Sequence, residues 1–228
     1  MKELGVFNGP YFVESYEEVE KLASLPVVQG WVERLAQQYG IRVVCFNWVQ
    51  GYRHFMTNKP VRRPEDLRGL RIRTPPAPVW QESVRALGAT PVALPFGEIY
   101  SALQQRAIDG AELVYANIPD MSLWEVLRYV NETKHFLLIH CQVVGEAWYQ
   151  RLPANYRQIL REECVRAGRE TSMRIQQEEA RIKQLVQQRG MTIVSDVDLA
   201  AFRKAAETAY ERLGLKAVRD ALYQALRK

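Results

Sequence analysis

Arg73 stands at the end of the segment GLRIRT (69–74), directly before a turn that carries three prolines within four residues. In open parallel sheets, ligands bind beyond the carboxyl ends of the strands. A guanidinium at that edge offers two parallel N–H donors, which match a carboxylate. The pattern therefore predicts an anion site at Arg73, and the alternative is a salt bridge to a nearby Asp or Glu. Arg71 begins the same strand, away from this edge, so we expect it to be a surface residue.

Other reactive side chains do not form a catalytic or metal-binding set. No G-x-S-x-G nucleophile elbow and no glycine-rich phosphate loop is found. His54, His135 and His140 lack the spacing of metal ligands, and Asp109-Gly110 reads as a turn into a strand rather than as an acid catalyst. We therefore expect no cofactor and no metal, and an α/β enzyme is the less favoured alternative.

The three cysteines, Cys45, Cys141 and Cys164, are far apart and form no Cys-x-x-Cys motif. Cys45 and Cys141 lie in apolar, strand-like segments. Packed free thiols are therefore favoured over a disulfide or a metal site.

Composition is that of an ordinary globular protein, with 47% hydrophobic and 25% charged residues among 228. The net charge of +5 is spread along the chain without a basic stripe, so a nucleic-acid partner is not expected. No run of about 18 apolar residues predicts a transmembrane helix. The first 21 residues contain no apolar core of a signal peptide, so no export signal is expected within this sequence.

Helical and strand-like segments alternate along most of the chain. Ser15 and Glu18 form a capping box for a first helix, and a second helix begins at Pro26 and ends at Gly40. The segment 41–48 is apolar and β-branched, which indicates a buried strand. Further strands are expected at 69–74, 90–94, 108–114, 134–144 and 191–196, and helices at 78–88, 96–107 and 119–130, with two helices closing the chain. This alternation predicts an α/β fold with a mostly parallel sheet.

A much longer helix is predicted after Pro153. Apolar or small residues recur on one side of the segment, and glycine occurs only at 168 and 190. About 36 continuous residues would extend ~55 Å, which is longer than one domain of ~100 residues can cover. The helix is therefore expected to run along two domains, with a bend or break at Gly168 as the alternative.

Several separated motifs resemble the solute-binding proteins of TRAP transporters, the DctP family. They are GYRHFMTNKPVRRPEDLRGLRIRTP (51–75), ALGATPVALPFGEIYSALQQRAIDGAE (86–112) and WEVLRYVNETKH (124–135). The order and spacing of these blocks match the family pattern. The resemblance extends from about Val6 to the C-terminus.

This resemblance implies a two-lobed, periplasmic-binding-protein-like receptor that is not an enzyme. Such a receptor binds a small organic acid outside the cytoplasm and delivers it to TRAP membrane permease subunits. The implied division places 1–50 in domain I, 51–138 in domain II, 139–178 in domain I as a return strand and long helix, and 179–228 in domain II. The first lobe is expected to be incomplete relative to the family. Exposed strand edges could then favour a homodimer, and a shortened chain that binds no ligand is an alternative.

The same resemblance assigns roles to individual residues. Arg73 takes the place of the arginine that grips the ligand carboxylate, Arg53 that of an assisting arginine, and Phe96 that of a pocket aromatic. Leu113 stands where the family often has Asn or Trp, so a polar contact is in doubt there.

Three further aromatic residues lie near the presumed pocket along the sequence. Trp48 and Tyr52 flank the crossing between the domains, and Trp80 follows the Arg73 turn. Each can pack against the body of a ligand or belong to the core.

Overall fold

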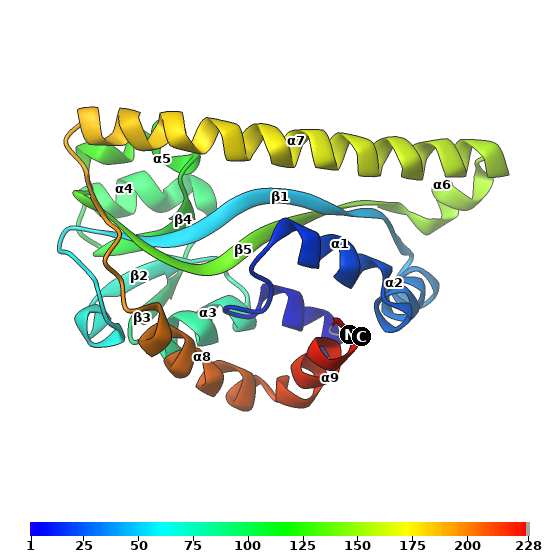
Figure 1. Cartoon of the computed structure of the whole chain (residues 1–228), viewed down its shortest axis with the longest axis horizontal. Coiled ribbons are helices and arrows are strands. Elements are labelled where there is room, and N and C mark those ends of the chain that lie inside the picture. Colours follow the sequence, from blue (N-terminus) through cyan, green and yellow to red (C-terminus); the bar gives the residue numbers. More distant parts are fainter. Residues whose placement is uncertain (227–228) are drawn as a thin grey trace.

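A computed structural model describes residues 1–226 of the chain (Figure 1). Its strands are β1 (Ile41–Thr57), β2 (Arg71–Thr74), β3 (Thr90–Ala93), β4 (Gly110–Val114), β5 (Tyr129–Gly145) and β6 (Thr192–Val194). Its α-helices are α1 (Tyr16–Ser24), α2 (Pro26–Tyr39), α3 (Pro78–Ala86), α4 (Ile99–Gln104), α5 (Asn117–Asp120), α6 (Glu146–Arg151), α7 (Ala154–Gln188), α8 (Leu199–Leu213) and α9 (Lys216–Leu226). Short 3-10 helices cover Lys2–Asn8, Pro64–Leu67, Phe96–Glu98 and Leu123–Glu125.

The six strands form one mixed sheet in the order β3-β2-β4-β1-β5-β6. Strand β2 pairs in parallel with β3 and β4, and β5 with β6, as the α/β prediction requires. The two long strands β1 and β5 are antiparallel to each other, and β1 is also antiparallel to β4. The α/β class is confirmed, and the central ladder differs from the expected parallel pairing.

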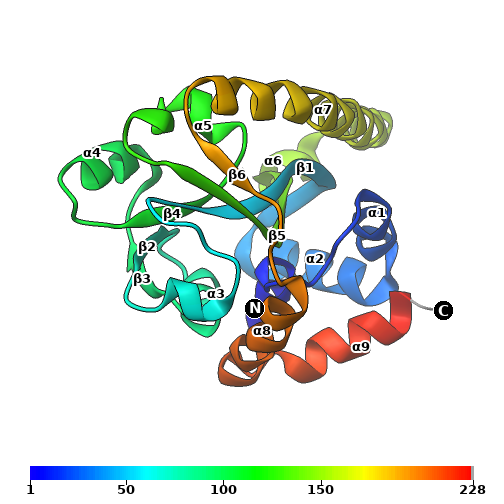
Figure 2. The ribbon, with the colours of Figure 1, turned by 60° about the vertical axis from the view of Figure 1, so that its left-hand side comes forward.

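Helices cover the sheet on opposite sides. Figure 1 shows α7 extending along the whole length of the β1–β5 pair, with α8 and α9 on the other side of the sheet. Figure 2 shows α3 and α8 below the sheet and α4 and α5 toward the end of α7. No helix among residues 1–226 combines the length and apolarity needed to span a bilayer.

The closing helices connect two apolar clusters. Phe202 of α8 packs in a cluster that also contains Phe55. Tyr210, farther along α8, and Leu222 of α9 pack instead with the N-terminal Phe12. Helix α8 therefore contributes to both apolar clusters. The division into two domains stays a prediction.

The segment 119–130 was predicted as one helix, and this is wrong. It forms α5, a short 3-10 helix and the start of β5. Ser122 adopts a left-handed backbone conformation (φ 50°), which interrupts the helix. Val130 is fully buried and pairs with Met56 of β1, so strand pairing takes precedence over the local helical pattern.

The long helix α7 is continuous over 35 residues, and the alternative of a break at Gly168 is excluded. Gly168 instead lies close against β1. A Cβ atom there would lie 2.5 Å from Oδ1 of Asn47 and 2.8 Å from Cδ1 of Trp48. Next to it, Ser172 Oγ accepts a hydrogen bond from the backbone N–H of Val49 at 2.9 Å.

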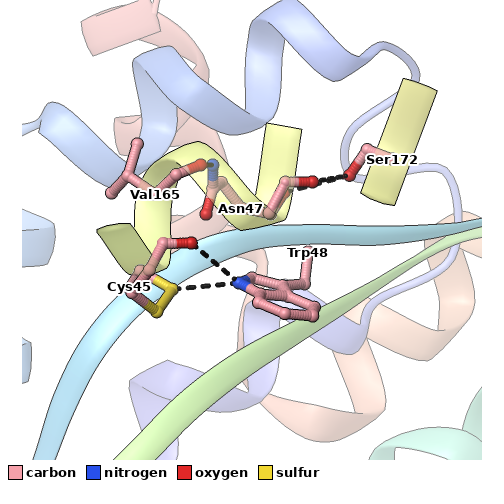
Figure 3. Close-up of a disulfide and its surroundings, with 7 residues drawn as sticks. Cys45, Asn47, Trp48, Val165 and Ser172 are labelled. Carbon is pink, nitrogen blue, oxygen red and sulfur yellow. Dashed lines mark hydrogen bonds between the residues drawn. A yellow bond between two sulfur atoms is a disulfide. The ribbon is translucent and has the colours of Figure 1, made fainter. Parts of the chain in front are cut away.

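Cys45 and Cys164 form a disulfide between β1 and α7, which corrects the prediction of packed free thiols (Figure 3). The two residues are 119 positions apart in sequence, and only the docking of α7 on β1 brings their Cα atoms to 6.0 Å. The indole N–H of Trp48 lies 3.1 Å from Cys45 Sγ and 3.2 Å from the carbonyl oxygen of Cys164. Cys141 is free as expected, but it is exposed rather than packed.

Candidate functional site

Arg73 lies on β2, close to its carboxyl end, and its side chain is buried. The residue is only 3% exposed. Its Nε donates a hydrogen bond to the carbonyl oxygen of Leu94 at 2.9 Å, and its Cζ lies 5.9 Å from the ring centre of Phe96. Among residues 1–226, no carboxylate lies within salt-bridge distance of this guanidinium. The alternative of an internal salt bridge is therefore not realised.

The Arg73 charge is held in an unfavourable environment. Burial lowers the pKa of Arg73 to about 10, while Glu112 raises it and Arg53 lowers it. The side chain still carries its charge at neutral pH. A buried cation without a counter-ion is costly, so an anion bound beside the terminal nitrogens would relieve this cost.

Arg71 shows the contrast two residues earlier on the same strand. Its guanidinium is exposed, as expected, and pairs with Asp109 at 2.9 Å. Asp109 also accepts the backbone N–H of Arg71 at 2.9 Å, so it ties the entry of β4 to the start of β2. This pair satisfies Arg71 within the protein, whereas the nearby Arg73 remains without an acid.

Arg53 and Glu112 form a buried ion pair on neighbouring strands. The Nε of Arg53 donates to the Glu112 carboxylate, and its Nη2 donates to the backbone carbonyl oxygen of Glu112. Arg53 is 5% exposed and Glu112 is fully buried. The Arg53 guanidinium also lies over the ring of Trp80, 4.8 Å from its centre, which is the geometry of a cation–π contact.

Two more side chains complete this buried polar group. Thr74 donates its hydroxyl to Glu112 at 2.8 Å, and Nε2 of His135 lies 3.7 Å from Glu112, beyond hydrogen-bonding distance. Nδ1 of His135 lies 2.7 Å from Thr133 Oγ1. If the threonine hydroxyl donates there, the ring proton is on Nε2 and faces the carboxylate.

Protonation in this group follows from burial and charge. Burial alone would raise the pKa of Glu112, but the Arg53 charge and the contacts from His135 and Arg53 lower it overall. Burial lowers the pKa of His135 more than Glu112 raises it. Glu112 is therefore ionised and His135 neutral at pH 7. Together with Arg53 and Arg73, the group carries one net positive charge.

The structure brings together four of the seven sequence-predicted site residues. They are Arg73, which lies beside Phe96, and Arg53, which lies beside Trp80. Glu112 links the two arginines, because it forms an ion pair with Arg53 and its charge raises the pKa of Arg73. Phe96 is 47% exposed, so its ring is available at the surface beside Arg73.

The other three predicted residues lie elsewhere. Leu113 is fully buried in the apolar cluster that includes Met56 and residues of α4, so its side chain is in the core rather than at the surface of a pocket. Trp48 packs against α7 beside the disulfide. The hydroxyl of Tyr52 donates to the backbone carbonyl oxygen of Glu14.

Sequence reasoning missed the roles of Thr74 and His135, and it gave Glu112 no partner. One signal was present: Glu112 is a charged residue inside the apolar strand segment IDGAELV, and a buried carboxylate needs a cation nearby. Neither the strand pairing nor the identity of that cation could be read from the sequence.

No cluster of three or more potential metal ligands occurs within residues 1–226. Three hollows of the surface follow α7 and have volumes of about 940, 260 and 290 Å³, and two others, of about 480 and 380 Å³, lie beside Asn58 and Arg106. None of these hollows is lined by Arg73 or by the residues described around it, namely Arg53, Thr74, Trp80, Phe96, Glu112 and His135. The charged guanidinium of Arg73, buried and without a carboxylate partner among residues 1–226, is a group to which an anion can bind reversibly.

Comparison with known proteins gives a consistent assignment. The family model for bacterial extracellular solute-binding protein, family 7 (DctP) matches residues 1–216. The sialic acid-binding periplasmic protein SiaP of Vibrio cholerae is 25% identical over 89% of this chain. The match covers 62% of SiaP, so this chain spans about three fifths of the length of this curated relative.

Solved structures of TRAP periplasmic solute-binding proteins share the fold. One from Escherichia fergusonii, in an apo open form, is 31% identical with a TM-score of 0.89 and covers 98% of this chain and 75% of its own. One from Ochrobacterium anthropi with bound L-fuconate is 28% identical with a TM-score of 0.91 and covers 98% of this chain and 74% of its own. The family match over residues 1–216 and these structural relatives lead to one conclusion: the chain belongs to family 7 of the bacterial extracellular solute-binding proteins, the DctP family.

Proposed function

We propose that this protein is a solute-binding receptor of a TRAP-type transporter that binds an organic acid through Arg73. The observation that carries the proposal is the buried, charged guanidinium of Arg73, which has no internal carboxylate partner. A ligand carboxylate would accept hydrogen bonds from its terminal nitrogens, with each charge-assisted bond contributing about 1.5–3 kcal/mol. Phe96 would cover the apolar part of the ligand.

Arg53 has a supporting role in this proposal. Glu112 occupies its Nε and Nη2, which leaves Nη1 for a direct or water-mediated contact with the ligand. Trp80 and Glu112 fix the orientation of the guanidinium, so little side-chain entropy would be lost on binding. The relatives' ligands named above, sialic acid and L-fuconate, are both acids, which supports the same class for this chain.

The wider setting is proposed on the same basis. The ranges 1–50 and 139–178 would form one lobe and 51–138 and 179–228 the other, closing on the acid without chemical turnover. Delivery to TRAP membrane permease subunits and a periplasmic or extracytoplasmic location follow from the family. The Cys45–Cys164 disulfide supports that location, because structural disulfides persist in oxidising compartments.

Thermal-shift and isothermal titration measurements against a set of sugar acids, keto acids and aromatic acids test the proposal. At least one acid should stabilise the wild-type protein, and Arg73→Ala should abolish the effect. Arg71→Ala is the matched control, because it removes an exposed arginine from the same strand and should leave binding unchanged. Equal binding by wild type and Arg73→Ala would rule out the arginine clamp, and silence across the whole set would favour a chain that binds no ligand.

A further inference from the structure

Within residues 1–226, Glu112 is the one carboxylate whose charge acts on the pKa of Arg73. It lies on β4 and is fully buried. Its carboxylate accepts hydrogen bonds from Arg53 on β1 and from the hydroxyl of Thr74 on β2, the latter at 2.8 Å. His135 on β5 faces it at 3.7 Å. Side chains from three strands thus hold this negative charge in a fixed position beside the two arginines.

The charges of this group do not cancel. Arg53 and Arg73 each carry one positive charge, and Glu112 carries one negative charge. His135 adds none at pH 7, because burial lowers its pKa. Two further titratable rings lie near the group and are also neutral at pH 7, because burial lowers the pKa of each: His54 and His140. The group is therefore one positive charge in excess.

Solvent screens this excess charge only weakly, because both arginines are nearly buried and Glu112 is completely so. In such surroundings each unit of charge interacts strongly with its neighbours. An anionic head group with one negative charge would neutralise the group. A head group with two negative charges would leave one buried charge without a partner, which is costly. The number of charges on the head group therefore matters more here than it would at an exposed arginine.

The shape of the Arg73 guanidinium does not make this distinction. Its N–H donors match the oxygen atoms of a carboxylate and those of a phosphate. Selectivity between the two needs a repulsive element in addition to the attractive one. Glu112 is such an element, because its fixed negative charge cancels one of the two positive charges that attract an anion.

We propose that Glu112 makes the site selective for head groups that carry one negative charge and excludes doubly charged phosphate monoesters. Carboxylates and phosphodiesters belong to the first class. Glu112 acts through the charge of the two arginines and is a positioning residue rather than a ligand contact. The inference rests on the proposed function, since it takes Arg73 as the anion clamp.

The test compares an acid that stabilises the wild-type protein with the phosphate monoester that has phosphate in place of its carboxylate, such as phenyl phosphate for benzoate. Between pH 5.5 and pH 7.5 the monoester changes from one to two negative charges, because its second pKa is about 6. By isothermal titration, its affinity for the wild type should fall about 25-fold over this interval, which is the ratio of its singly charged fractions. The carboxylate keeps one charge, so its affinity should stay nearly constant and reports any titration of the protein itself.

Two variants separate charge from structure. Glu112→Gln keeps the shape of the side chain and raises the net charge of the group to two, so the affinity for the monoester should rise with pH. Arg53→Gln/Glu112→Gln returns the net charge to one, and the affinity for the monoester should again fall with pH. Arg71→Ala is the control and should behave like the wild type. A purely structural role of Glu112 would change the affinity for both compounds alike and would not reverse the pH dependence.

The proposal is overturned if the affinity of the wild type for the monoester stays constant or rises with pH, or if Glu112→Gln keeps the pH dependence of the wild type. A monoester that binds neither protein at any pH also overturns it. Should Glu112→Gln fail to fold, the wild-type profiles of the two compounds decide the question without it. Binding of the acid that survives Arg73→Ala is a different result, because it contradicts the proposed function itself.

Discussion

The buried guanidinium of Arg53 is bound by both the side chain and the backbone carbonyl of Glu112. Arg73, whose pKa responds to both of these residues, has no such partner. The two arginines therefore differ: Arg53 has an internal carboxylate partner and keeps its Nη1 for the proposed ligand contact, whereas Arg73 has no carboxylate partner among residues 1–226 and is the proposed anion clamp.

The first prediction concerns this buried pair. Glu112→Leu leaves the Arg53 charge buried without a counter-ion, so the free energy of unfolding should fall by about 3–5 kcal/mol. The double variant Arg53→Met/Glu112→Leu removes both charges and should recover part of that loss. Urea denaturation at pH 7 measures the free energy of unfolding of the single and the double variant. If the double variant is as unstable as the single one, the buried charge is not the cause.

Part of this arrangement could be predicted from the sequence. The prolines after Arg73 end β2 at a known place, so the position of its guanidinium near the carboxyl end of the strand follows from local chemistry. The 35-residue helix followed from its apolar stripe. These features depend on residues close together in the chain.

The remaining features depend on residues that only the folded chain brings together. Glu112 and Leu113 are neighbours on β4, and their side chains point to opposite faces, as in any strand. Which face holds Arg53 depends on the pairing of β4 with β1, which local patterns do not encode. The Cys45–Cys164 disulfide has the same origin, because α7 must first dock on β1.

The second prediction concerns pH. Burial lowers the pKa of His54 and of His135 in the folded protein. Below about pH 6.5 the unfolded chain takes up protons that these buried rings do not, so stability falls as the pH decreases, by up to about 1.4 kcal/mol per pH unit for each ring. Glu112 has a lowered pKa, so its contribution is lost only at lower pH.

Urea denaturation between pH 7 and pH 5 checks this. The wild-type protein should lose stability over this interval, and His54→Gln should show a smaller slope because one titrating ring is removed. An unchanged slope in the variant would mean that His54 is not responsible for the pH dependence.

The third prediction concerns the disulfide. It links residues 119 positions apart, and a cross-link over a long loop restricts the unfolded chain strongly. The double variant Cys45→Ser/Cys164→Ser should therefore lose about 2–5 kcal/mol of stability. Reductant should destabilise the wild-type protein similarly and have no further effect on the double variant. Cys141→Ser is the control, and it should unfold like the wild type, since Cys141 is exposed and free.

The fourth prediction compares two glycines inside helices. Gly30→Ala in α2 should stabilise the protein by about 0.5–1 kcal/mol, because nothing lies within 4 Å of the new Cβ and alanine favours the helix. Gly168→Ala in α7 should instead cost about 1–3 kcal/mol through overpacking. The new Cβ would meet Asn47, whose amide is held by the carbonyl oxygen of Val165 at 2.9 Å. Thermal denaturation measures the stability of both variants. If Gly168→Ala were also more stable than the wild type, α7 would be able to move away from β1.

The fifth prediction separates ligand binding from core packing. Phe96 is 47% exposed beside Arg73, whereas Leu113 is fully buried in the cluster around α4. Phe96→Ala removes little buried surface, so the unfolding free energy should hardly change, but the affinity for an acid identified by titration should fall. Leu113→Ala creates a cavity, so stability should fall by about 2–5 kcal/mol, with affinity retained at a temperature where the variant is folded. Isothermal titration gives the affinity of each variant for the acid, and urea denaturation gives its free energy of unfolding. If Leu113→Ala lost affinity without losing stability, the side chain of Leu113 would contact the ligand, which would contradict its placement in the core.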